Sequence, residues 1–309
     1  KNDITMAGTS MLTSADDRGL SDLILNSIGL DPGLIGELAE AGEITGRVSK
    51  KASELTGLPE NAPIVASGHD TQFAVFGSGA GINQPVLSSG TWEILMVRSG
   101  KYRSGMEQMD NRISTELDPL PGLYNIGNQW IASGMLEWAG RNMFPECGDE
   151  MHEKMISMAS TVPPGSRGIR VVPEFFGEGE GSGGGSISGL TMESTREESY
   201  RAMLEALSLR LREGMMALEK AGGFTTDNIL CVGGGSKNRL WNQVRADITG
   251  VPLRVIDKKE TTVLGAAMFI MYAAGIASSP DEAREMIPYE TETFEPGKNS
   301  KIYREIFGG

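Results

Sequence analysis

The 309-residue sequence predicts an α/β protein in which a mixed sheet is flanked by helices. β-rich runs alternate with helical runs in the second half of the chain, giving a strand over 229–232, a helix over about 237–249, a strand over 253–256 and a helix from about 262. Glycine-rich turns separate these runs, and 39% of the residues are hydrophobic, which is enough for a large core.

The first 62 residues are predicted to form helices and connections. Apolar residues at helical spacing over 20–28 and again over 34–41 predict two helices, each of which ends at a glycine. At Pro63 the pattern changes to strands and glycine-rich turns, beginning with an apolar run at 64–66. We therefore expect a domain boundary between residues 62 and 63.

The middle of the chain is predicted to mix hairpin, helix and loop. Two β-rich runs meet at Ser89-Gly90 in PVLSSGTWEILMV, residues 85–97, which predicts a tight hairpin. A helix over 130–144 and a short strand over 169–173 follow. The stretch GEGEGSGGG at 177–185 predicts a flexible surface loop from its composition.

The strongest helical signal covers 196–221. A capping box, either Ser194 with Glu197 or Thr195 with Glu198, precedes it, and Gly222-Gly223 ends it. Its apolar residues form one stripe, which predicts a face packed in the core. That stripe consists of Tyr200, Met203, Leu204, Leu207, Leu211, Met215 and Leu218.

Composition and charge exclude several classes of function. A formal charge of −13 argues against a nucleic-acid surface, and an anionic ligand would need backbone N–H groups and a divalent metal. Cys147 and Cys231 are far apart, which predicts free buried thiols in a reducing cytosol. The longest uncharged apolar stretch, 263–277, is too short for a membrane span, so we expect a cytoplasmic protein. Because the chain begins at Lys1 without a methionine, we expect a piece of something longer.

The first candidate site is the turn CVGGGSKNRLWNQ, residues 231–243. A strand that breaks into three glycines before a helix brings backbone N–H groups together, which suits phosphate or a flat ring. Ser236 could cap the helix, and Asn238 could hydrogen-bond a base. An ordinary tight turn is the alternative.

Two further candidates lie earlier in the chain. The hairpin tip at 88–91, Ser-Ser-Gly-Thr, offers hydroxyl and N–H groups to a terminal phosphate, although such tips are common in hairpins. In IVASGHDTQ, residues 64–72, polar side chains follow a strand end, where α/β sheets place ligand chemistry. Asp70 could instead cap the next helix, and His69 could be a buried imidazole. His152 lies in a charged stretch and is expected at the surface.

Taken together, these segments resemble the FGGY family of carbohydrate kinases. The matching stretches, in order, are NDITMAGTSML at 2–12, ASGHDTQFAVFGSGAG at 66–81, PVLSSGTWEILMVRS at 85–99, GLYNIGNQWIASGMLEWAGR at 122–141, LCVGGGSKNRLWNQVRADI at 230–248 and ETTVLGAAMF at 260–269. The resemblance implies two actin-like domains, each with a ribonuclease-H-like sheet, that close over ATP and a sugar. The family's opening Asp-x-Gly-Thr loop is not in this sequence. Residues 1–62 then correspond to the end of the first domain and 63–309 to the second.

The resemblance also implies roles for individual residues. Asp70 matches the catalytic base, and His69 and Gln72 beside it match sugar contacts. Gly90 and Thr91 match the motif that faces the β- and γ-phosphates. The positions implied to bind the rest of the nucleotide are Ser133, Gly234, Gly235, Ser236 and Asn238. Mg²⁺ is implied with ATP, but no residue of this chain is implied as a metal ligand.

The implied function is an ATP-dependent ketose kinase, with L-fuculose as the substrate. The chain would carry the ATP-side domain, would be inactive without the missing N-terminal kinase domain, and could form a homo-oligomer. One alternative is a kinase for L-rhamnulose or another ketose. The others are an actin-like nucleotide-binding module that regulates without phosphotransfer, and a structural domain that binds no nucleotide.

Overall fold

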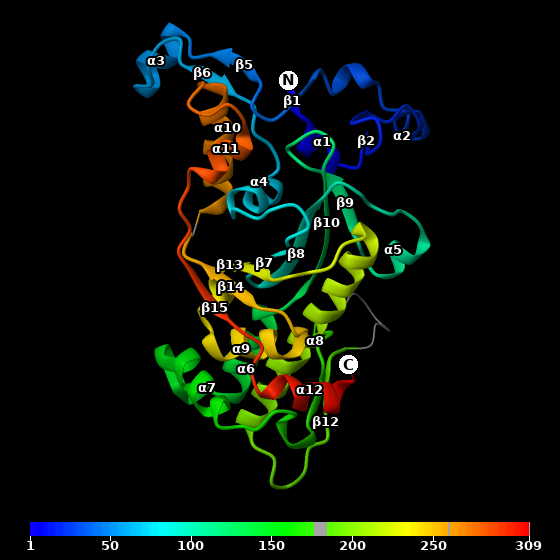
Figure 1. Ribbon diagram of the computed structural model, residues 1–309, viewed down its shortest axis with the longest axis vertical. Helices are drawn as coiled ribbons and strands as arrows, with labels where there is room; N and C mark the ends of the chain where they lie inside the picture. Colours follow the sequence, from blue (N-terminus) through cyan, green and yellow to red (C-terminus); the bar gives the residue numbers. More distant parts are fainter. Residues whose placement is uncertain (176–183, 259, 309) are drawn as a thin grey trace.

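The computed structural model describes residues 1–175, 184–258 and 260–308 (Figure 1). Its N-terminal part consists of short elements at one end of the molecule. They are β1 (Asn2–Asp3), α1 (Ile4–Thr9), β2 (Thr13–Ser14), β3 (Gly19–Leu20), α2 (Asp22–Ile28), a 3₁₀ turn η1 (Pro32–Leu34), β4 (Leu38–Ala39), β5 (Ile44–Arg47), α3 (Lys50–Thr56) and β6 (Pro63–Val65).

The structure confirms one of the two early helices and corrects the other. Helix α2 ends at Gly29, which adopts the left-handed conformation typical of a helix end. The helix predicted over 34–41 is wrong: Gly36 has φ of +75°, which interrupts a helix, and β4 pairs in parallel with β1. Strand β6 pairs with β5 across the boundary expected at residue 62, and the boundary itself stays a prediction.

The main sheet has seven strands in the order β15-β14-β13-β7-β8-β10-β9. Strands β7, β13 and β14 run parallel and the other pairs run antiparallel, so the predicted mixed sheet is confirmed. Its strands are β7 (Val86–Ser89), β8 (Trp92–Ser99), β9 (Ser114–Leu117), β10 (Tyr124–Ile131), β13 (Ile229–Val232), β14 (Leu253–Ile256) and β15 (Thr291–Phe294). The β7–β8 pair is the predicted hairpin, with Ser89 opposite Glu93.

Helices cover both faces of this sheet (Figure 1). Alternate strand residues point to opposite faces: Leu87 and Leu95 pack in the larger core, whereas Val86 and Met96 pack in the smaller one. The larger core receives α6 (Ser133–Met143), α7 (Met151–Ser160), α8 (Arg196–Gly222) and α9 (Arg239–Thr249). The opposite face receives α4 (Asp70–Gly77), and α10 (Thr261–Ala273) packs against α4.

Smaller elements complete the described fold. They are α5 (Met106–Asp110), η2 (Pro145–Glu150), η3 (Ser166–Gly168), η4 (Gly234–Lys237), α11 (Pro280–Glu285), α12 (Asn299–Phe307) and the antiparallel pair β11 (Arg170–Val172) with β12 (Ser186–Ser188). Strand β11 confirms the short strand predicted there. Residues 177–183 of the predicted glycine-rich loop lie outside the described residues.

The predicted helix over 130–144 is partly wrong. Trp130 belongs to β10, which pairs with β8 as far as Ile131, and α6 begins only at Ser133. The cause is a long-range contact, because the Trp130 indole N–H donates to Glu93 Oε2 at 2.9 Å and holds this end of the strand in the sheet.

Helix α8 confirms the strongest prediction. Thr195 and Glu198 form the capping box, and all seven residues of the apolar stripe are buried. Cys147 and Cys231 are free and buried, as expected. Within the described residues, no helix is both long and apolar enough to cross a membrane.

Candidate functional site

A pocket of about 540 Å³ lies where the β7–β8 hairpin tip meets the turn after β13. Gly90 and Thr91 line it from the hairpin tip, and Ser133 lines it from the start of α6. Gly234, Gly235 and Asn238 line it from the glycine turn. The fold therefore brings together six of the seven residues expected to bind nucleotide. Their role as nucleotide ligands stays a prediction. We call this space the glycine-turn pocket.

Close packing between the two loops requires glycine at two positions. Gly233 has φ of +90°, and a Cβ there would lie 2.5 Å from the backbone oxygen of Ser89. A Cβ on Gly235 would lie 2.2 Å from Ser89 Oγ. Gly234 is different, since a Cβ there would meet no described atom within 4 Å. Close packing therefore explains the glycines at 233 and 235. At Gly234, which lines the pocket, the missing side chain leaves space in the pocket.

The cap of α9 differs from the expectation. Asn238 is the N-cap, and its Oδ1 accepts from the backbone N–H of Trp241 at 3.0 Å. The Ser236 hydroxyl instead donates to the carbonyl of Gly233 at 2.6 Å, which closes the turn, and Ser236 is outside the described lining of the pocket. The prediction that Ser236 caps the helix is therefore wrong.

A fully buried polar network lies beneath both loops. The Arg245 guanidinium forms an ion pair with Glu93 and donates to Ser89 Oγ at 2.7 Å. The Ser89 hydroxyl donates to Glu93 Oε1 at 3.1 Å. Burial raises the pKa of the Glu93 carboxyl, although Arg245 opposes this. The network fixes the hairpin tip against α9, and it was missed in the sequence because its members are far apart.

The other walls of the glycine-turn pocket are mixed in character. Leu136 and Trp241 provide apolar surface, and the Tyr200 hydroxyl accepts from Asn238 Nδ2 at 3.4 Å. Burial raises the pKa of Tyr200, so it stays a neutral phenol. His152 is exposed, as expected, yet it lines the rim of this pocket. An apolar cleft with a few polar groups suits a flat aromatic ring.

Asp70 lies at the first position of α4, on the opposite face of the sheet. Its side chain is 77% exposed, and its Oδ1 accepts from the Thr71 N–H at 2.7 Å and lies 3.5 Å from His69 Nε2. The N-cap of α4 is His69, so the carboxylate does not occupy the capping position considered as an alternative. Most of the Asp70 carboxylate therefore faces solvent.

A cavity of about 190 Å³ connects Asp70 to the strand ends. Ser88 of β7 and Val232 of β13 line it together with Asp70 and Thr262. Val232 directly precedes the glycine turn, and Ser88 lies two residues before Gly90 of the hairpin tip. The Asp70 cavity and the glycine-turn pocket thus lie at the same end of β7 and β13, on opposite faces, with the hairpin tip and glycine turn between them.

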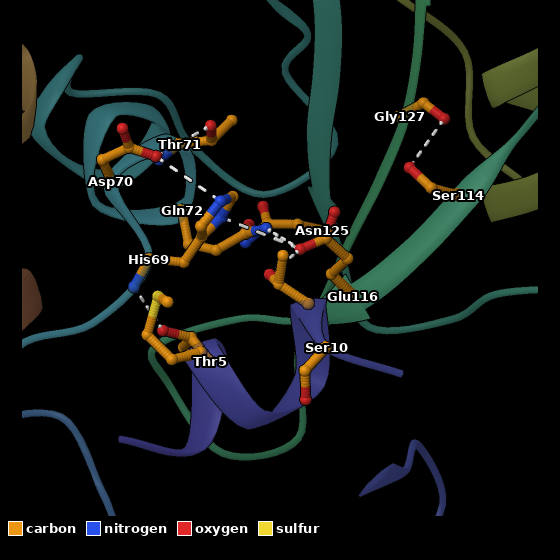
Figure 2. Close-up of polar contacts among 12 residues, drawn as sticks. Thr5, Ser10, His69, Asp70, Thr71, Gln72, Ser114, Glu116, Asn125 and Gly127 are labelled. Atoms are coloured by element: carbon orange, nitrogen blue, oxygen red, sulfur yellow. Dashed lines mark hydrogen bonds and ion pairs between the residues drawn. The ribbon is translucent and has the colours of Figure 1, made fainter. Parts of the chain in front are cut away.

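His69 and Gln72 converge on a carboxylate that sequence reasoning missed (Figure 2). Gln72 is fully buried, and its Nε2 donates to Glu116 Oε2 at 2.8 Å. His69 is 21% exposed, and its Nδ1 lies 3.8 Å from the same oxygen. The backbone N–H of His69 donates to Thr5 Oγ1 at 2.8 Å, which joins this cluster to α1.

The described residues offer no ready-made metal cage. Among them, no three His, Cys, Asp or Glu side chains gather as a metal-binding group. Magnesium prefers phosphate oxygens, waters and one or two carboxylates to a cage made wholly of protein. The described side chains therefore fit Mg²⁺ only as an ion that arrives with a phosphate ligand.

Two family models match most of this chain. Residues 1–77 match the model for the N-terminal domain of the FGGY family of carbohydrate kinases, and residues 86–274 match its C-terminal domain. L-fuculokinase from Escherichia coli O157:H7 is 42% identical over 98% of this chain and 63% of its own length. L-fuculokinase from Haemophilus influenzae is 40% identical over 92% of this chain and 60% of its own.

A solved structure shares the fold at low sequence identity. A ligand-bound xylulose kinase from Lactobacillus acidophilus has a TM-score of 0.89 at 19% identity and covers 99% of this chain and 62% of its own. The likeness places the chain in the actin-like ATPase fold, as expected from the sequence. The chain spans about 60% of the length of the curated relatives described above.

Proposed function

The chain belongs to the FGGY family of carbohydrate kinases, and on that premise we propose that it forms the larger part of an ATP-dependent kinase that phosphorylates L-fuculose. The observation that carries the proposal is the shared strand end. The glycine-turn pocket and the Asp70 cavity open on either side of the same β7 and β13 ends. A nucleotide in the first and a sugar near the second would meet at the hairpin tip.

The proposed chemistry is an in-line phosphoryl transfer. The Asp70 carboxylate accepts the proton of a sugar hydroxyl while that oxygen bonds to the γ-phosphorus of ATP, and the bond to the ADP oxygen breaks. Such transfers need mainly positioning and charge stabilisation. The hairpin tip at Gly90 and Thr91 would face the terminal phosphates, and Gly234, Gly235 and Asn238 would hold the adenosine. Mg²⁺ bound to the phosphates would neutralise part of their charge.

L-fuculose is proposed because four relatives at 40–42% identity are L-fuculokinases. A xylulose kinase from Bacillus subtilis is only 26% identical. We further propose that residues 63–309 form the second kinase domain, and that activity requires a first domain completed by segments this chain does not contain.

The test uses a polypeptide of the relatives' full length that carries this sequence. ADP release is measured with ATP, Mg²⁺ and a panel of L-fuculose, L-rhamnulose and D-xylulose. The proposal predicts the highest kcat/KM for L-fuculose. A higher kcat/KM for another ketose would assign that ketose as the substrate and would leave the kinase activity itself supported. Nucleotide binding without ketose-stimulated ADP release would contradict the kinase and favour a regulatory module.

A further inference from the structure

We propose that Glu116 determines sugar specificity, because it sits in a pocket that would hold the non-reacting end of the ketose; this inference rests on the proposed kinase function. The pocket has a volume of about 340 Å³ and lies beside Asp70 on the same face of the sheet. We call it the Glu116 pocket. Its polar lining includes His69, Thr71, Arg112, Ser114, Glu116 and Gln129.

Glu116 is contacted by residues of two helices, α1 and α4 with its N-cap His69. Its Oε2 accepts from Gln72 Nε2 of α4 at 2.8 Å and from Thr9 Oγ1 of α1, and lies 3.8 Å from His69 Nδ1. The side chain is only 19% exposed. Because all three neighbours meet one oxygen, Oε1 is left to accept from a donor in the pocket. A carboxylate fixed in this way is a preorganised acceptor for a hydroxyl group.

The cluster around Glu116 contains two buried polar atoms that have no hydrogen-bond partner among the described residues. Gln72 is fully buried, and its Oε1 has no hydrogen-bond partner among them. His69 Nδ1 is also buried without a hydrogen bond to any described residue. Leaving such groups unpaired costs about 1–3 kcal/mol each. Of these two residues only His69 lines the Glu116 pocket, so the imidazole rather than the Gln72 amide lies at the wall that a ligand would contact.

Arg112 supplies the opposite kind of group to the Glu116 pocket. Its φ is +54°, a conformation that is uncommon for arginine and that turns its chain at the pocket wall. Strained backbone of this kind often marks a ligand site. A guanidinium, a carboxylate, the Gln129 amide and the Ser114 hydroxyl together offer both donors and acceptors, which matches a neutral polyhydroxyl compound better than an anion.

The Glu116 pocket connects directly to the proposed catalytic carboxylate. His69 lies between the two acids, with Nε2 at 3.5 Å from Asp70 Oδ1 and Nδ1 at 3.8 Å from Glu116 Oε2. Thr71 and Ile94 line both the Glu116 pocket and the Asp70 cavity. A ketose bound along this wall could place one end at Asp70 and its remaining hydroxyls at Glu116.

The experiment measures KM and kcat for L-fuculose, L-rhamnulose and D-xylulose, and KM for ATP, in the full-length polypeptide. Glu116→Ala should raise the KM for the preferred ketose about 10- to 100-fold, because a fixed acceptor is lost, and should reduce discrimination between ketoses. Glu116→Gln keeps one acceptor oxygen and the shape of the side chain. Its ketose KM should therefore lie between that of the unaltered enzyme and that of Glu116→Ala. KM for ATP should change less than about twofold in both variants.

The matched control is Glu282→Gln in α11, where the carboxylate also accepts from a hydroxyl group, that of Ser278, but lines none of the pockets described above. It should leave every KM unchanged. An unchanged ketose KM in both Glu116 variants would overturn the inference while leaving the kinase proposal intact. Equal rises in the ketose and ATP KM values would also overturn it, as they would show general distortion. If the unaltered enzyme phosphorylates no ketose, the proposed function and the inference fail together.

Discussion

Replacing Gly235 with alanine would insert a methyl group between the two loops of the glycine-turn pocket. The new Cβ would lie 2.2 Å from Ser89 Oγ and 3.2 Å from Ser89 Cβ, whereas ordinary contact begins at 3.4 Å. The loops must therefore separate by about 1.2 Å. Ser89 cannot turn away without breaking its bonds to Glu93 and Arg245, because all three side chains are fully buried.

The expected magnitudes follow from that displacement. Overpacking of a buried contact costs about 1–3 kcal/mol, which for a protein of this size lowers Tm by roughly 2–5 °C. A misplacement of about 1 Å at a catalytic site can cost about 100-fold in rate. If the glycine turn holds ATP, kcat/KM for ATP should fall by about that factor in Gly235→Ala.

Two companion variants separate packing from nucleotide binding. Gly234→Ala meets no described atom within 4 Å, so Tm should stay within about 1 °C, while ATP affinity should still fall because the methyl group enters the pocket. Ser89→Ala alone should also lower Tm, because it removes two buried hydrogen bonds, but the Ser89→Ala/Gly235→Ala double variant should lose less than the sum of the two single losses, because the clashing Oγ is gone. Thermal unfolding and steady-state kinetics give both readouts. A lower Tm with unchanged kcat/KM for ATP would refute the nucleotide assignment, and an unchanged Tm would refute the packing geometry.

Three further predictions concern the buried groups and the length of the chain. Arg245→Met leaves the buried Glu93 carboxylate without an ionic partner, so the free energy of unfolding measured in urea should fall by about 3–5 kcal/mol. The fall should be smaller when Arg245→Met is combined with Glu93→Leu. Burial raises the pKa of the Cys231 thiol from 9.0 to about 11, so its stabilising contribution is full below pH 9 and is lost as pH rises through 11. The difference in unfolding free energy between wild type and Cys231→Ala should therefore fall by about 2–3 kcal/mol between pH 8 and 12; a constant difference would contradict it. The 309-residue chain alone should show no ketose-stimulated ADP release, and measurable release would show that the remaining length is dispensable.

The sequence predicted the elements whose signals are local. The α8 stripe, its capping box and the β7–β8 hairpin are each defined by residues within a few positions of one another. The same holds for the glycine turn, because a strand that runs into three glycines and a helix has few other geometries. The expected nucleotide residues, by contrast, came from the family resemblance, and the structure brings six of them to one pocket.

The sequence failed where distant residues decide the structure. Glu93 and Arg245 are 152 positions apart, and Gln72 and Glu116 are 44 apart, so neither pair leaves a local pattern. Trp130 was assigned to a helix because its bond to Glu93 could not be foreseen. The helix predicted over 34–41 rested on apolar residues that happen to have helical spacing. Gly36 interrupts a helix there, and β4 pairs with β1 instead.

The most direct test of the proposed mechanism is the turnover of Asp70→Asn in the full-length polypeptide, with ATP affinity measured alongside. Asparagine keeps the size of the side chain but cannot accept the sugar proton as a base. The side chain is 77% exposed, so the fold should be unaffected. We expect kcat to fall by about 100- to 10,000-fold with ATP affinity unchanged. A kcat within a few fold of the unaltered enzyme would contradict the assignment of Asp70 as the base.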